Sequence, residues 1–247
     1  MDARLWRRRP PRRAAPARPR ARSGPPAAAD RGGVHRGLML QHPPAALVFD
    51  LDGTLIDSRE DITAAINRTR AGYELPPLAL EQVVAMVGEG ARRLVERALT
   101  DLPEQDLDEA LAAYLDHYGR VCLDATLPYP GVPEMLERLA ASYPLALLSN
   151  KGEALSRRVL AGLGLDRFFR EILGGDSLPT RKPDPAGLHL LAERLGVPVE
   201  RLLLVGDTRI DAETAAHAGC PFALVEWGFP RPPGVESLRA DLRVARA

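Results

Sequence analysis

Short apolar runs recur along the chain, each ending at an acidic residue, a Ser-Asn pair or a glycine. They span residues 45–49, 144–148, 171–173, 201–205 and 222–225. Runs of this length and composition, stopped by polar or turn residues, predict buried β-strands. Helical periodicity fills the intervals between the later runs, over residues 155–162, 185–195 and 211–219. Alternating strands and helices predict an α/β fold with a doubly wound parallel sheet, a Rossmann-like core with helices on both faces.

A different pattern fills residues 58–127, where apolar residues recur at helical spacing and no strand pattern interrupts them. Ser58 and Asp61 are expected to cap the first of these helices. The apolar stripes are Ile62, Ala65 and Ile66; residues 80–87; Ala91, Leu94, Val95, Ala98 and Leu99; and Leu107, Ala110, Leu111, Tyr114, Leu115 and Tyr118. Four helices directly after the first strand predict an all-helical cap.

Several prolines and a glycine after residue 127 mark the return of the chain from this cap. We therefore expect a catalytic core made of residues 44–57 and 128–247, with residues 58–127 as the cap. Residues 1–43 are rich in Arg, Pro and Ala and have no apolar periodicity, so a disordered tail is expected there. A nucleic-acid-binding arm, a transit peptide and a start of translation at Met39 are alternative interpretations of the tail.

The net charge of zero hides an uneven distribution. The first 38 residues hold 11 arginines and two aspartates, so the remainder has 22 basic and 31 acidic residues. Cys122 and Cys220 lie far apart and form no metal-binding spacing, which favours a reducing, cytoplasmic location. No apolar run reaches the length of a membrane span, so no membrane partner is expected. The oligomeric state stays open.

Candidate chemistry begins at the end of the first expected strand. Asp50 follows it directly, Asp52 comes two residues later, and Gly53 allows a sharp turn. Two carboxylates leaning to one side repel each other unless a cation neutralises them. A hard divalent cation such as Mg²⁺ suits these oxygen ligands and leaves one carboxylate oxygen free to attack phosphorus.

Other polar residues follow the later strands and are expected at the same edge of the sheet, where ligands bind in such folds. Ser149 and Asn150 offer a hydroxyl and an amide for phosphoryl oxygens. Asp207 would complete the metal site, whereas Asp211 is equally suited to the metal and to a helix N-terminus.

Lysine is rare in this chain, with Lys151 and Lys182 alone among 33 basic residues. Both lie in loops that follow or lie between the expected strands. A retained lysine favours a site that needs a compact point charge. We expect Lys182 to balance the nucleophile and phosphoryl charges. No role is assigned to Lys151 or to Asp176.

These residues together resemble, in order, the four motifs of the haloacid-dehalogenase-like superfamily of phosphatases. The motif residues are Asp50, Asp52, Gly53 and Thr54; Ser149; Lys182; and Gly206, Asp207 and Asp211. The resemblance covers residues 45 to about 228. Segments 128–132, 174–179, 181–185 and 218–220, with the helical region around residues 87–99, are similar to the bacterial phosphoglycolate phosphatases.

The resemblance implies roles for these residues. Asp50 would be the nucleophile and a metal ligand. Asp52 would be the general acid and base, touching the metal through its backbone or carboxylate, and Asp207 would be a further Mg²⁺ ligand. Ser149 and Lys182 complete the expected catalytic set, and Thr54 and Asn150 are expected to bind substrate. The arginine-rich tail and the segment from Trp227 depart from the family pattern and leave the substrate open.

Two arginines complete the expected substrate site. Arg92 and Arg93 lie off the apolar stripe of the third cap helix, which follows a glycine-bounded turn. Their guanidinium groups suit a small carboxylate, although exposed surface cations are an equally good interpretation.

The sequence thus predicts a Mg²⁺-dependent phosphomonoester hydrolase that acts through an aspartyl-phosphate intermediate on a small-molecule phosphate ester, 2-phosphoglycolate first. A sugar-phosphate phosphatase or a phosphomutase is the alternative enzyme. A dehalogenase is disfavoured because Asp52 supplies proton transfer, which cleavage of a carbon-halogen bond does not need. A nucleic-acid-binding protein that uses the tail is the alternative of another class, and intact carboxylates at each motif argue against it.

Overall fold

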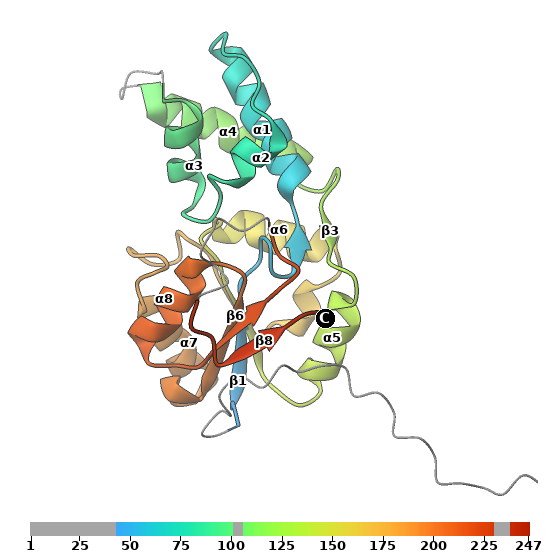
Figure 1. Cartoon of the computed structure of the whole chain (residues 1–247), viewed down its shortest axis with the longest axis vertical. Helices are drawn as coiled ribbons and strands as arrows, with labels where there is room; N and C mark the ends of the chain where they lie inside the picture. The colour runs from blue at the N-terminus through green and yellow to red at the C-terminus, as the bar shows by residue number, and fades with distance from the viewer. Residues whose placement is uncertain (1–42, 101–105, 230–237) are drawn as a thin grey trace, which may run out of the picture. The chain divides into compact units, whose positions relative to one another are not determined.

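Six parallel strands form the central sheet of a computed structural model, which describes residues 43–100, 106–229 and 238–247 (Figure 1). Their order is β5-β4-β1-β6-β7-β8. The strands are β1 (Ala46–Phe49), β4 (Leu145–Leu148), β5 (Glu171–Leu173), β6 (Leu202–Gly206), β7 (Phe222–Val225) and β8 (Leu242–Val244). The expected α/β class and parallel pairing are confirmed.

The sheet is covered on both faces, and the alternation of side chains along β1 shows how. Leu47 and Phe49 belong to one apolar cluster, with residues of α5 (Val132–Ala140) and α6 (Glu153–Gly162). Ala46 and Val48 belong to the other, with residues of α7 (Ala186–Leu195) and α8 (Arg209–Ala218). Figure 1 shows α7 and α8 on one side of the sheet and α5 on the other. A strand buried on both faces needs the continuous apolar run seen in the sequence.

Among the core elements that were not predicted are one α-helix and one strand of the central sheet. Helix α5 carries apolar residues at helical spacing, including the buried Val132 and Leu136, but two prolines at its start masked the pattern. Strand β8 has only three residues, all of them half-buried, because it lies at the edge of the sheet beside β7. A short edge strand lacks the apolar run that marks a central one.

Strands β2 (Ile56–Asp57) and β3 (Leu127–Pro128) pair as an antiparallel ribbon, and the described residues between them form four α-helices. They are α1 (Arg59–Gly72), α2 (Leu80–Val84), α3 (Ala91–Ala98) and α4 (Leu107–Val121). Helix α1 packs chiefly against α4. We call these helices the cap. Cap and core belong to one compact unit, so the division into two domains stays a prediction.

Details of the cap differ from the expectations. Helix α2 ends at Val84 rather than at residue 87. Ser58 occupies the N-cap position of α1 but makes no capping hydrogen bond. The Asp61 carboxylate instead accepts hydrogen bonds from the backbone of Ala125 and Thr126, and so ties α1 to the end of the cap. The Ser58 hydroxyl donates to the Asp52 carboxylate instead of capping the helix. The partners of Ser58 and Asp61 thus come from outside α1.

The expected tail, residues 1–43, lies almost wholly outside the described residues. Among the residues that are described, no helix is both long and apolar enough to cross a membrane.

Candidate functional site

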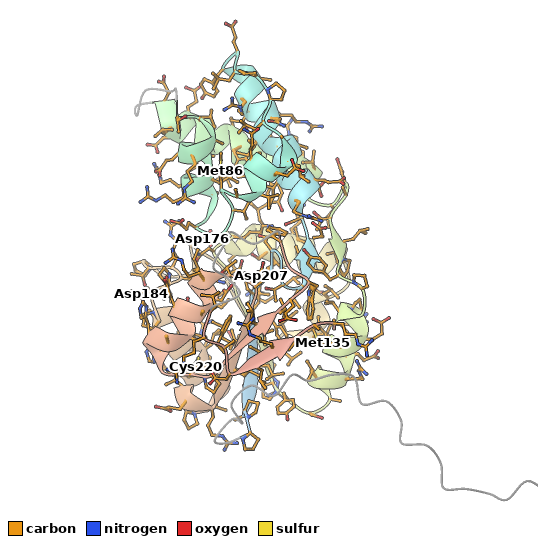
Figure 2. All side chains as sticks on the ribbon, viewed as in Figure 1. Met86, Met135, Asp176, Asp184, Asp207 and Cys220 are labelled. Atoms are coloured by element: carbon orange, nitrogen blue, oxygen red, sulfur yellow. The ribbon has the colours of Figure 1, made fainter. Side chains whose placement is uncertain are left out.

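Adjacent parallel strands bring the predicted catalytic residues to one edge of the sheet. Asp50, Ser149 and Asp207 directly follow β1, β4 and β6, which are neighbours in the order β4-β1-β6. Phe49 is in register with both Leu147 and Val205, so the three strands end at the same level. Figure 2 shows Asp207 at the end of the sheet nearest the cap. Ligands of doubly wound sheets bind at this kind of edge.

Three buried carboxylates gather at this edge. Oxygens of Asp50, Asp207 and Asp211 lie within 4.8 Å of one another. Burial, followed by the charges of Asp211 and Asp50, raises the pKa of Asp207 well above its ordinary value. Burial also raises the pKa of Asp50 to about 6, although Lys182 opposes the shift. Three buried carboxylates in one place, two of them with raised pKa values, form a site that favours a cation.

Lys182 faces this cluster. Its Nζ lies 2.8 Å from Asp50 Oδ1 and 2.6 Å from Asp211 Oδ1, and its side chain is almost fully buried. Burial by itself lowers the pKa of Lys182, but the charges of Asp211 and Asp50 outweigh it and hold the pKa above its ordinary value. The lysine therefore stays charged, and one positive charge stands against three carboxylates.

Asp211 has two functions in this arrangement, which the sequence left as alternatives. Its Oδ2 accepts hydrogen bonds from the backbone and hydroxyl of Thr208, the N-cap residue of α8, in a capping box. Its Oδ1 accepts the hydrogen bond from Lys182. The residue thus starts a helix and also belongs to the carboxylate cluster.

The Asp207 carboxylate is held by residues from two loops. Thr54 Oγ1 donates to its Oδ1 at 3.1 Å, and the backbone N–H of Phe229 lies 3.3 Å from its Oδ2. A Cβ atom at Gly53 or Gly228 would collide with this carboxylate, and Gly53 also has a positive φ of 84°. Both loops therefore approach so closely that only glycine fits.

Sequence reasoning missed the contribution of the segment after β7. Trp227 Nε1 donates to the backbone oxygen of Thr54, so the tryptophan fixes the loop that carries the first motif. The segment was noted only as a departure from the family pattern. Its place after a strand was the available signal, because Asp50, Ser149 and Asp207 also follow strand ends.

Asp52 lies apart from the carboxylate cluster. Its Oδ1 accepts hydrogen bonds from Lys151 Nζ at 2.6 Å and Ser58 Oγ at 2.5 Å. The carboxylate is absent from the group of described acidic residues that could share an ion. A metal contact through the backbone of Asp52, the other expectation, remains a prediction. The side chain instead lines the cavity, and its role in proton transfer remains a prediction.

A cavity lies between this edge and the cap. Its core side is polar, and the lining residues there include Asp50, Asp52, Ser149, Asn150, Lys151 and Lys182. Its cap side is mainly apolar, with Ile62, Val87, Leu94, Tyr114, Leu115 and Tyr118. The described cations that line it are the two lysines of the chain. Both lysines therefore place positive charge where an anionic ligand could be held.

The two predicted substrate arginines are not brought into this cavity. Arg92 pairs with Asp108 and Glu96, and Arg93 pairs with Glu96. Their side chains are 46% and 62% exposed. They lie off the buried stripe, as expected, and line a separate hollow between α3 and the core segment 181–183, outside this cavity. Binding of substrate by Arg92 or Arg93 therefore remains a prediction, which their ion pairs and their place outside the cavity do not favour.

The remaining predicted residues have specific partners. Asn150 Nδ2 donates to the backbone oxygens of Gly88 in the cap and Lys182 in the core, and its Oδ1 is buried without a partner among described residues. Ser149 lines the cavity beside Asp50. Asp176, left open by the sequence, accepts a hydrogen bond from the backbone N–H of Glu153 at the start of α6.

Comparison with known proteins agrees with this geometry. A family model of haloacid dehalogenase-like hydrolases matches residues 44–219. The phosphoglycolate phosphatase of Rhodospirillum rubrum is 41% identical over 206 residues, covering 80% of this chain and 85% of that protein. That of Agrobacterium fabrum is 37% identical over 194 residues, covering 76% and 83%. A crystal structure of a predicted phosphoglycolate phosphatase from Haemophilus somnus 129PT superposes with a TM-score of 0.79 at 30% identity, covering 83% of this chain and 96% of that one.

Proposed function

The chain belongs to the haloacid dehalogenase-like hydrolases and is a phosphoester hydrolase, and from this premise we propose that it hydrolyses 2-phosphoglycolate to glycolate and phosphate. The observation that carries the proposal is the contact between Asp50 and Lys182 within a group of buried carboxylates. The similarity to phosphoglycolate phosphatases, which extends over most of their length, supports the choice of substrate. The apolar cap wall of a cavity that also holds two lysines suits a small anionic ester.

The buried carboxylates fit a divalent cation. Asp50 and Asp207 are the predicted ligands, with Asp52 as a third through its backbone, and Asp211 belongs to the same cluster as the first two. Oxygen ligands and excess negative charge are what Mg²⁺ prefers. When bound, Mg²⁺ supplies positive charge that neutralises the carboxylates and polarises the phosphoryl group.

The first step is transfer of the phosphoryl group to Asp50. A carboxylate oxygen of Asp50 attacks phosphorus, and the bond from phosphorus to the ester oxygen breaks. Asp52 donates a proton to that oxygen, so that glycolate leaves as an alcohol. Lys182 holds positive charge beside the reacting carboxylate, and Ser149 offers a hydroxyl to a phosphoryl oxygen.

The second step releases phosphate. Asp52 takes a proton from water while the water oxygen attacks phosphorus, and the bond between phosphorus and Asp50 breaks. The Asp50 carboxylate and the protonated Asp52 are thereby restored. The apolar side chains of the cap wall line the cavity in which both steps take place.

A substrate panel tests the proposal. Purified protein with Mg²⁺ would be assayed for phosphate release from 2-phosphoglycolate, glucose 6-phosphate, glucose 1-phosphate and 4-nitrophenyl phosphate. We expect the highest kcat/KM for 2-phosphoglycolate and loss of activity with a chelator. A higher value for a sugar phosphate would favour the related sugar-phosphate phosphatases, and isomerisation of a sugar phosphate without phosphate release would indicate a phosphomutase.

A further inference from the structure

Lys151 makes two hydrogen bonds that the proposed reaction does not use. Its Nζ donates to Asp52 Oδ1 and to Tyr118 Oη, both at 2.6 Å. Lys151 lies in the core loop after β4, whereas Tyr118 belongs to the cap helix α4. One side chain therefore joins the acid-base carboxylate of the core to the cap.

This contact is shielded from water. The side chains of Lys151 and Asp52 are 7% and 13% exposed, and Tyr118 is 1% exposed. A charged hydrogen bond in such surroundings is screened little by salt and is stronger than one at the surface. The phenol ring of Tyr118 is itself held by parallel stacking on Tyr114, with centroids 5.8 Å apart. The Tyr118 hydroxyl that binds Lys151 is therefore held in a fixed position.

Both hydrogen bonds to the Asp52 carboxylate reach the same oxygen. Oδ1 accepts from Lys151 and from Ser58, at the start of the first cap helix. Among the described residues, no hydrogen bond reaches Oδ2. The carboxylate is therefore fixed in rotation, with one oxygen bound to protein and the other available to the leaving group and to water.

The residue before Lys151 also contacts the cap. Asn150 Nδ2 donates to the backbone oxygen of Gly88, in the turn that precedes α3. Consecutive residues of one core loop therefore hold the cap at two separate places, α4 and the turn before α3. Only the Lys151 contact continues to Asp52, so the position of α4 and the orientation of Asp52 are linked through this lysine.

We propose that Lys151 is a positioning residue, which Tyr118 of the cap anchors and which orients Asp52 for proton transfer. Asp52 is then oriented to give its proton to the leaving group only when α4 packs against the core and Tyr118 holds Lys151. The inference rests on the proposed function, because it concerns the proton that Asp52 gives to the leaving group. An alkyl ester needs that proton, whereas a nitrophenolate leaves without it.

The test compares three esters in the full-length protein with Mg²⁺. They are 2-phosphoglycolate, ethyl phosphate and 4-nitrophenyl phosphate, and kcat/KM is measured because it covers the steps up to departure of the leaving group. We expect Lys151→Met to lower kcat/KM on both alkyl esters by about 10- to 100-fold and to leave the aryl ester nearly unchanged. Lys151→Arg should recover part of the loss.

Tyr118→Phe removes only the hydroxyl that anchors the lysine. It should produce the same pattern with a smaller loss, about threefold to tenfold on the alkyl esters. Tyr73→Phe is the matched control, because Tyr73 lies at the end of α1 and does not line the cavity. Asp52→Asn serves as the reference for complete loss of proton transfer.

Each other outcome overturns the inference. Equal losses on all three esters would mean that Lys151 only supports the fold. A loss confined to 2-phosphoglycolate would mean that Lys151 binds the substrate carboxylate, and wild-type values throughout would remove it from the reaction. If the wild-type protein hydrolysed none of the esters, the proposed function itself would be refuted. Failure of the inference alone would leave wild-type activity and the Asp52→Asn defect intact.

Discussion

Lys182 Nζ lies 2.8 Å from Asp50 Oδ1, so the predicted nucleophile is half of a buried ion pair. The two residues come from distant parts of the chain and meet only through the order of the parallel strands. The pair sets the charge of the nucleophile, because Lys182 opposes the effect of burial on the pKa of Asp50. It also means that a change at Asp50 affects stability as well as activity.

Asp50→Asn should abolish phosphate release while the protein stays folded. The amide has the size of the carboxylate but cannot attack phosphorus. Lys182 keeps its second partner, Asp211, so no charge is left buried and alone. Phosphate release and circular dichroism would measure the two effects. Asp57→Asn is the matched control, since Asp57 pairs with Arg59 outside the cluster, and activity in Asp50→Asn near that of the control would contradict a covalent mechanism.

The same variant tests how the titration of Asp50 makes the stability of the metal-free protein depend on pH. Burial raises the pKa of Asp50 from 3.8 to about 6, so the folded protein binds this proton more tightly than the unfolded chain. Protonation of Asp50 therefore stabilises the folded state, and this contribution is complete below about pH 4 and is lost as the pH rises through about 6. Asp207 shifts in the same direction.

In a chelator, therefore, the free energy of unfolding of Asp50→Asn minus that of wild type should increase between pH 4 and 7, by at most about 3 kcal/mol. Denaturant unfolding at a series of pH values measures this difference. Mg²⁺ should suppress it, because a bound cation favours the ionised carboxylates of the wild type. A difference that is constant with pH would show that Asp50 titrates as it does in the unfolded chain.

The strand ends were predictable because central strands of a doubly wound sheet are continuous apolar runs, and the residue that stops each run is visible in the sequence. Asp50, Ser149 and Asp207 were placed at one edge by that reasoning alone. The parallel topology brings these three residues close together, because neighbouring parallel strands end at the same edge of the sheet. The family of the chain and its α/β fold followed from the same residues.

Contacts across the cap were not predictable, because helical periodicity shows which face is buried but not what the other face meets. Arg92 meets Asp108 of the next helix, and Lys151 meets Tyr118 from another part of the chain. Ser58 has the sequence context of a helix cap, yet its hydroxyl donates a hydrogen bond to the carboxylate of Asp52, six residues earlier. The contacts of Arg92 and Lys151 depend on how α4 packs on its neighbours, because Asp108 and Tyr118 both belong to that helix.

Replacing Arg92 and Arg93 together by Ala should change kcat/KM for 2-phosphoglycolate by less than about fivefold. Both side chains form exposed ion pairs, which contribute roughly 0–1 kcal/mol each to stability, and neither lines the cavity. The measurement is kcat/KM for 2-phosphoglycolate and for 4-nitrophenyl phosphate at fixed ionic strength. A loss of tenfold or more on the first ester alone would place the arginines at the substrate carboxylate after all.

Thr54→Val should weaken Mg²⁺ binding rather than substrate binding. The Thr54 hydroxyl donates to Asp207 Oδ1, and its side chain is fully buried, so it orients a predicted metal ligand and does not reach the substrate. Loss of such a partner costs about 10- to 100-fold in metal affinity. The Mg²⁺ concentration for half-maximal activity should therefore rise by that factor, while kcat and KM at saturating Mg²⁺ stay near wild type.

Thr126→Val separates this effect from the general cost of removing a buried hydroxyl. Thr126 is also buried and also donates to a carboxylate, that of Asp61, but it lies at the end of the cap and outside the carboxylate cluster. It should lower the melting temperature without changing the Mg²⁺ dependence. If Thr54→Val instead raised KM for 2-phosphoglycolate at saturating Mg²⁺ and left the Mg²⁺ dependence unchanged, Thr54 would bind the ester, as its motif alone suggested. The two threonines thus distinguish a residue that orients a metal ligand from one that only stabilises the fold.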